Sequence, residues 1–227
     1  MSTLVPSASQ KRLLDSTTRA YESALRSPSG EQAYAYLRED RALSEETLAR
    51  YRVGFVDQPA DGHSAAAGFI SIPYVTPTGV VDIRFRRPPG SDKPYKYYTL
   101  PGRPTRIFGT GVLATPGRVV AITEGEIDAM SSTQAGLPAV GIPGVKAWKE
   151  YYARIFAGFE RVLIFTDNDD RKDGEEEGVG QKFANVVAKD LAEVGVSADT
   201  ILMPEGHDVN SFLKENGEHE LRIYAGA

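Results

Sequence analysis

The chain has 227 residues, of which 41% are hydrophobic and 25% charged, and its formal net charge is −5. These values are ordinary for a globular protein and allow one large domain or two small ones. The absence of cysteine excludes disulfides and a cysteine-based zinc site, and no apolar run approaches the roughly 18 residues of a membrane span. The polar, serine-rich start also lacks the pattern of a signal peptide. We therefore expect a cytoplasmic protein without a membrane partner.

The charges are unevenly distributed along the chain. Residues 167–177 hold seven acids against two bases, whereas residues 82–106 hold seven bases against two acids. One acidic and one basic segment suit an enzyme that binds metal in one place and phosphates in another. Two solvated loops would explain the same charges.

The first half of the chain predicts three helices followed by a β-hairpin. Apolar residues at helical spacing predict a helix over 9–27 and a second around 33–37. Ser44 is a natural N-cap for a third. The runs 68–75 and 80–86, joined by a turn, predict the hairpin.

Basic residues lie on and after the second hairpin strand. Strand alternation places Arg84 and Arg86 on one face, where two guanidinium groups can bind phosphates side by side. Further on, Lys96 adjoins Tyr97, a base beside a ring that can stack on a nucleobase. A solvated strand face and an edge strand packed on the core are the alternatives.

The second half alternates strands with helices, beyond a boundary rich in glycine and proline near residue 112. The predicted strands are 118–123, 138–142, 160–166 and 199–203, and the predicted helices are 126–136, 147–157, 178–194 and a short one from 208. The fold class is therefore α/β: a mainly parallel sheet flanked by helices over 113–227, preceded by a smaller α+β domain over 1–112.

Two of these strands end in acids. Glu124 follows the first strand, and Asp167 and Asp169 follow the third. Ligands of such sheets bind at the carboxyl ends of the strands, and converging carboxylates repel unless a cation neutralises them. The pattern predicts a divalent-metal site, with Asp128 one helical turn beyond Glu124. Alternatively, Glu124 initiates a helix and Asp128 is a surface acid.

These acidic motifs resemble the TOPRIM domain, and further segments resemble the catalytic core of bacterial DnaG-type primases. Asp208 lies in a segment similar to the family's third acidic motif, with Asn210 in place of the second aspartate. Lys96 and Tyr97 match the family's nucleotide-binding segment, and residues 35–55 resemble its helical opening. The resemblance runs in order over about residues 20–215.

The resemblance implies a DNA primase, a nucleotidyltransferase that makes short RNA primers on single-stranded DNA from ribonucleoside triphosphates. It implies Mg²⁺ or Mn²⁺ as cofactor and no zinc. The residues that it implies are the catalytic, metal-binding acids Glu124, Asp167 and Asp169, the further metal ligand Asp208, and the nucleotide-binding residues Lys96 and Tyr97. The residue patterns add Asp128 as a metal ligand and Arg84 and Arg86 as nucleotide- or nucleic-acid-binding residues.

The expected protein is a stand-alone, phage-type primase core that acts in the cytoplasm of a bacterial host. A replicative helicase or a separate zinc-binding protein are further expected partners. Two alternatives stay open. The same acids could serve a TOPRIM nuclease or ribosomal-RNA maturase, and Asn210 favours a non-catalytic nucleic-acid-binding module in replication.

Overall fold

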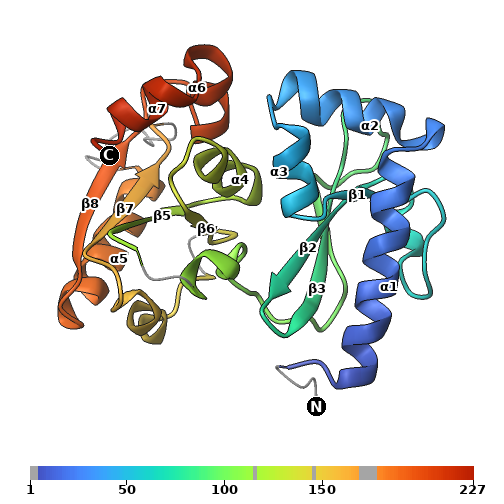
Figure 1. Ribbon diagram of the computed structural model, residues 1–227, viewed down its shortest axis with the longest axis horizontal. Helices are drawn as coiled ribbons and strands as arrows, with labels where there is room; N and C mark the ends of the chain where they lie inside the picture. The colour runs from blue at the N-terminus through green and yellow to red at the C-terminus, as the bar shows by residue number, and fades with distance from the viewer. Residues whose placement is uncertain (1–4, 115–116, 145–146, 169–177) are drawn as a thin grey trace. The chain divides into compact units, whose positions relative to one another are not determined.

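The computed structural model describes residues 5–114, 117–144, 147–168 and 178–227 (Figure 1). The chain forms two compact units, Met1–Thr105 and Arg106–Ala227, each with its own four-stranded sheet. Within the described ranges, no helix combines the length and the apolar character that crossing a membrane would demand.

The first unit begins with helices. They are α1 (Ala8–Leu25), the 3₁₀ turn η1 (Pro28–Gly30), α2 (Glu31–Ala35), the π-helical turn η2 (Tyr36–Asp40) and α3 (Glu45–Arg50). Ser44 caps α3 by accepting a hydrogen bond of 3.0 Å from the Thr47 backbone N–H, which confirms the predicted helix start.

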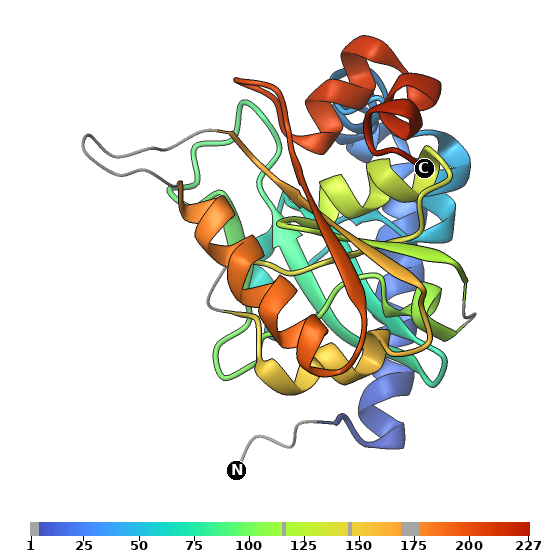
Figure 2. The same cartoon turned by 90° about the vertical axis from the view of Figure 1, so that its left-hand side faces the viewer.

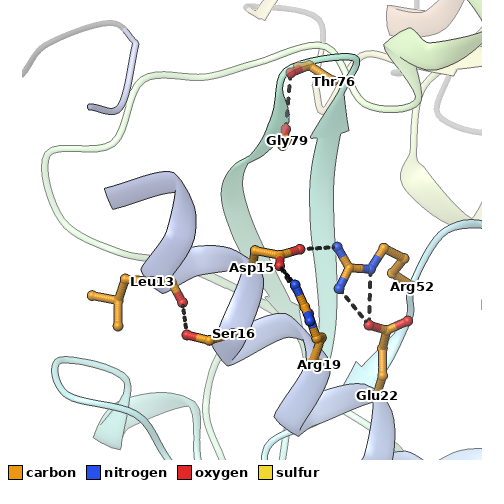
Figure 3. A network of polar contacts seen from close by, with 8 residues as sticks. All are labelled: Leu13, Asp15, Ser16, Arg19, Glu22, Arg52, Thr76 and Gly79. Carbon is orange, nitrogen blue, oxygen red and sulfur yellow. Dashed lines mark hydrogen bonds and ion pairs between the residues drawn. The ribbon is translucent and has the colours of Figure 1, made fainter. Parts of the chain in front are cut away.

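An antiparallel sheet follows in the order β1 (Gly54–Phe55), β2 (Ile70–Thr76), β3 (Gly79–Arg86) and β4 (Tyr97–Thr99), with the 3₁₀ turn η3 (Ser64–Ala66) between β1 and β2. The predicted hairpin is confirmed as β2 and β3, and the Thr76 hydroxyl donates to the Gly79 carbonyl across its turn (Figure 3). The long helix α1 packs on β1 and β3. The core between them contains Leu14, Tyr21, Val56, Phe69, Ile83 and Phe85.

A half-buried arginine network fixes the turn that leads from α3 into the sheet. Arg52 has φ +56°, a left-handed conformation that is uncommon for a large residue. Its guanidinium donates to Asp15 Oδ1 at 2.7 Å and, in a fork, to Glu22 Oε2 at 2.9 and 3.0 Å (Figure 3). Both carboxylates belong to α1, so α1 holds the strained turn in place.

The second unit is an α/β layer structure. Its elements are η4 (Thr110–Ala114), β5 (Val119–Thr123), α4 (Glu126–Gln134), β6 (Ala139–Gly141), η6 (Glu150–Phe156), β7 (Arg161–Thr166), α5 (Val179–Glu193), β8 (Ser197–Leu202), α6 (Val209–Asn216) and α7 (Glu218–Tyr224). All pairings in the order β6-β5-β7-β8 are parallel, as predicted. The predicted helix 147–157 is instead the shorter 3₁₀ helix η6, and α7 was not predicted.

Helices cover both faces of this sheet. The view onto the β8 edge places α5 and η6 on one side and α4 on the other (Figure 2). On the α5 side the core contains Val120, Ile122, Val162, Ile164, Trp148, Phe156, Phe183, Val187 and Leu191. The pattern follows from the sequence, since alternate strand residues and the i, i+4 face of α5 meet there.

The strand β8 forms one edge of the sheet. Arg161 of β7 forms an ion pair with Asp199 of β8 and donates to the Gly226 carbonyl at 3.0 Å. The Tyr224 hydroxyl donates to the Leu202 carbonyl at 2.6 Å. The last helix is therefore tied to the edge strand through side chains.

Candidate functional site

Two of the predicted acids lie at the ends of neighbouring strands. Glu124 follows β5 and Asp167 follows β7, and the two strands pair in parallel with Ile122 opposite Ile164. Both acids are half-buried. Because parallel strands end at the same edge of a sheet, their register places Glu124 and Asp167 at one edge.

A glycine in the first turn of α5, Gly180, leaves room for the Glu124 carboxylate. A Cβ built on Gly180 would lie 2.7 Å from Glu124 Oε1, 3.4 Å from Thr166 Cβ and 3.5 Å from the Asp167 carbonyl oxygen. The Glu124 carboxylate therefore occupies the room that a side chain at position 180 would need. The Glu124 carboxylate and the Asp167 backbone are therefore both near position 180.

The chemistry of this edge fits a hard divalent cation such as Mg²⁺. Carboxylate oxygens are its preferred protein ligands. The Thr166 hydroxyl is fully buried and has no hydrogen-bond partner among the described residues, which suits a polar ligand beside it. Within the described ranges, which omit Asp169, no three His, Asp or Glu side chains come close enough to form a metal site. Position 169 itself lies outside the described residues.

Asp128 faces the start of α6. Its Oδ1 atom accepts a 3.1 Å hydrogen bond from the Asn210 backbone N–H, and a Cβ on Gly125 would lie 2.9 Å from its Oδ2. The Asn210 side chain is 1% exposed and donates to the Ser131 hydroxyl at 2.8 Å. Asp128 and Asn210 thus join α4 to α6, and the amide at position 210 has a structural contact there.

Asp208 is the N-cap of α6. Its Oδ1 accepts from the Ser211 backbone N–H at 2.6 Å, while the Ser211 hydroxyl accepts from the Asp208 backbone N–H at 2.9 Å. This reciprocal capping box fixes the first turn of the helix. Asp208 is half-buried, so its role as a metal ligand stays a prediction.

In the first unit, the sequence-predicted arginines meet tyrosines. Arg86 is only 5% exposed; it donates to the Tyr36 hydroxyl at 3.1 Å and also to the Tyr97 hydroxyl. Arg41 donates to the same Tyr36 hydroxyl at 2.7 Å. The guanidinium of Arg86 thus supports two tyrosines of its own unit, and phosphate binding by Arg86 stays a prediction.

The two arginines also change the acidity of Tyr36. Burial acts to raise the pKa of this phenol, but the positive charges and hydrogen bonds of Arg86 and Arg41 outweigh burial. The pKa of Tyr36 therefore lies below its ordinary value of 10.0. The Tyr36 hydroxyl oxygen accepts a hydrogen bond from each of the two guanidinium groups and so orders both.

Two arginines of β3 and the lysine just before β4 lie around the Tyr97 ring. The Arg84 guanidinium carbon lies 4.6 Å from the Tyr97 ring centroid, that of Arg86 lies at 5.2 Å, and the Lys96 ammonium lies at 5.9 Å. Arg84 and Arg86 therefore share a face, as alternation predicts. Cation–π attraction holds the three positive charges together, and Lys96 is exposed to solvent.

Three residues that contact the predicted site residues were not predicted from the sequence: Tyr36, Arg41 and Gly180. Tyr36 and Arg41 come from the helical opening, about 50 residues before the strand that they support. No periodic pattern connects them. Gly180 has one weak sequence signal, a glycine within the first turn of a helix.

Comparison with known proteins agrees with this geometry. Residues 121–213 match the Toprim-like family. The chain is also 38% identical over 159 residues to the "Gene 57 protein" of Mycobacterium phage D29, an alignment covering 68% of this chain and 95% of that protein.

Solved structures extend the similarity to both units. The structure of the DnaG catalytic core has a TM-score of 0.77 at 18% identity, covering 99% of this chain and 79% of that one. The DnaG primase catalytic domain bound to ssDNA also has a TM-score of 0.77, at 19% identity, covering 95% and 80%. The RNA polymerase domain of Mycobacterium tuberculosis DnaG has 0.77 at 18%, covering 97% and 84%.

The molecule thus contains a Toprim-like domain and has the fold of a DnaG catalytic core, which confirms the resemblance and the fold class predicted from the sequence. It belongs to the family of the phage D29 Gene 57 protein.

Proposed function

We propose that this protein is a DNA primase core, a metal-dependent nucleotidyltransferase that makes short RNA primers on single-stranded DNA. The observation that carries the proposal is the pair Glu124 and Asp167 at one sheet edge, in a chain with the DnaG-core fold over 99% of its length. Oxygen ligands at that edge suit a reaction in which negative charge must be neutralised.

In this proposal the second unit holds the catalytic metal. Glu124, Asp167 and Asp169 are the catalytic ligands, and Asp208 and Asp128 complete the site directly or through water. Mg²⁺ or Mn²⁺, when bound, would neutralise the charge that develops on the transferring phosphoryl group. The capping bond of Asp208 and the Asn210 bond of Asp128 each engage the Oδ1 atom of the carboxylate.

The first unit, in the same proposal, binds the nucleotide or the template. Lys96 is exposed and Arg84 lies over Tyr97, so both carry charge suited to phosphate oxygens. Arg86 and Tyr97 contribute by orienting these groups, because their mutual hydrogen bond fixes the ring over which the cations gather.

The reaction is one in-line displacement. The 3′-oxygen of one nucleotide forms a bond to the α-phosphorus of the incoming triphosphate, and the bond from that phosphorus to the bridging oxygen breaks. Pyrophosphate leaves, and the hydroxyl proton passes to solvent. The residues of this chain contribute positioning and charge rather than covalent chemistry.

The proposed partners are single-stranded DNA and ribonucleoside triphosphates, with a replicative helicase or a separate zinc-binding protein as further candidates. A similar DnaG catalytic domain has been solved with ssDNA bound, which supports the template assignment. The relation to a phage protein supports action in the cytoplasm of a bacterial host.

Primer synthesis tests the proposal directly. Purified protein is incubated with single-stranded DNA, labelled ribonucleotides and Mg²⁺ or Mn²⁺, beside the variants Asp167→Asn and Lys96→Ala. We expect short RNA products that disappear with Asp167→Asn and need a higher nucleotide concentration with Lys96→Ala.

Two other outcomes would favour a function other than primer synthesis. Metal-dependent cleavage of RNA or DNA without synthesis would indicate a TOPRIM nuclease or maturase. DNA binding without either activity, in both metals, would contradict the primase proposal and favour a binding module.

A further inference from the structure

We infer that Gly180 is a positioning residue for the Glu124 carboxylate, and that the missing side chain at position 180 sets the geometry of the metal site. The inference rests on the proposed function for its catalytic meaning. Its structural basis is independent, because Glu124 Oε1 lies 2.7 Å from where a Cβ on Gly180 would stand.

The contact is closer than a carbon and an oxygen tolerate. Optimal contacts between non-bonded heavy atoms lie near 3.5 Å, so a methyl group at position 180 and the present carboxylate exclude each other. The backbone of Gly180 does not have positive φ and therefore accommodates alanine. The substitution is thus a local test that changes the space beside Glu124 without straining the chain.

Helix chemistry makes glycine an unexpected choice here. Position 180 is the second residue of α5, a helix of 15 residues, and alanine is the better helix former. The other neighbours of a methyl group at this position, Thr166 Cβ at 3.4 Å and the Asp167 carbonyl at 3.5 Å, would accept it. Only the end of the flexible Glu124 side chain must move, so the fold tolerates alanine while the carboxylate does not keep its place.

The surroundings explain why this place matters. Glu124 Oε1 is inaccessible to solvent, and the Cβ of the buried Thr166 lies 3.4 Å from the position of a Cβ on Gly180. The position of a Cβ on Gly180 is also 3.5 Å from the backbone carbonyl of Asp167, the second predicted ligand. Moving the Glu124 carboxylate would separate two oxygen donors that one cation would share.

The prediction is a variant that loses metal affinity without losing stability. Gly180→Ala should unfold at the same temperature as the wild type or higher, because of its helix propensity. Its Mn²⁺ affinity should be weaker by about 10- to 100-fold, the usual effect of disturbing ligand orientation. Electron paramagnetic resonance of free Mn²⁺ measures this affinity without nucleotide, DNA or turnover.

Gly111→Ala is the matched control. Gly111 lies in η4, its φ is not positive, and a Cβ there would meet no atom within 4 Å among the described residues. This variant should bind Mn²⁺ as the wild type does. Equal Mn²⁺ affinities for Gly180→Ala and the wild type would overturn the inference.

A double-mutant cycle tests the contact between Gly180 and Glu124 independently of metal binding. Gly180→Ala should raise the unfolding midpoint more in a Glu124→Ala background than in the wild type, because the excluded carboxylate is then gone. Equal shifts in the two backgrounds would mean that the two residues do not interact. If the wild type binds no Mn²⁺, the metal proposal fails, while this cycle still decides whether Gly180 positions Glu124.

Discussion

Asn210→Asp asks whether position 210 serves the fold or the metal. The wild-type amide is 1% exposed and donates to Ser131, while the Asn210 backbone N–H bonds Asp128 Oδ1 at 3.1 Å. Aspartate removes the side-chain donor and adds a second carboxylate near Asp128. If the position is structural, the variant should be strongly destabilised at neutral pH.

The expected size follows from these contacts. Loss of a buried hydrogen bond costs about 1–3 kcal/mol, and an unpaired buried charge raises the cost to about 3–5 kcal/mol. At about 2–4 °C per kcal/mol for a chain of this size, the unfolding midpoint should fall by roughly 10 °C. The loss should shrink as the pH falls, because a buried carboxyl with a raised pKa binds its proton before the unfolded chain does.

Thermal unfolding between pH 5 and 8, with and without Mg²⁺, measures the loss of stability and its dependence on pH. Asn210→Ala is the control, since it loses the hydrogen bond without gaining a charge; its smaller loss should not depend on pH. An Asn210→Asp protein as stable as the wild type, or one that Mg²⁺ stabilises more than the wild type, would refute the structural role and make position 210 a ligand site.

Two predictions concern the first unit. Arg52→Ala should cost about 1–3 kcal/mol in urea unfolding, because Glu22 and Asp15 both lose their ion pair with Arg52, although Asp15 keeps its pair with Arg19. Arg52→Gly should lose less stability than Arg52→Ala, since glycine accepts φ +56°; equal losses would show that the backbone stores no strain.

Burial and the charge of Arg103 lower the pKa of His63 from 6.5. As the pH drops below 6.5, the unfolded chain therefore protonates this histidine before the folded protein does, and stability should fall. His63→Gln should reduce that pH dependence; an unchanged profile would contradict the assignment.

Strands and helices whose apolar residues recur at regular spacing could be predicted from the sequence. Apolar strands ending in Glu124 and Asp167, and the buried face of α5, follow from alternation and helical spacing, so the parallel sheet and its acidic edge could be inferred. The 147–157 segment was harder, because the same apolar spacing serves a 3₁₀ helix as well as an α-helix.

Contacts between distant residues were not predictable. Alternation placed Arg86 on the correct face, but its burial depends on the hydroxyls of Tyr36 and Tyr97, from other elements. Likewise the role of Gly180 depends on Glu124, which lies 56 positions earlier. A single sequence does not show how far apart two such residues lie in space, because only folding brings them together.

The edge strand β8 has a consequence for colloidal behaviour. Met203 donates its N–H to the Thr166 carbonyl of β7, so by alternation the Leu202 carbonyl points away from the ladder, and the Tyr224 hydroxyl occupies it. Charged Asp199 lies midway along the strand. An open strand edge invites pairing with another molecule, and a blocked carbonyl and a charge both discourage it. The protein should therefore resist growth of intermolecular β-sheet from this edge at the high concentrations used for purification.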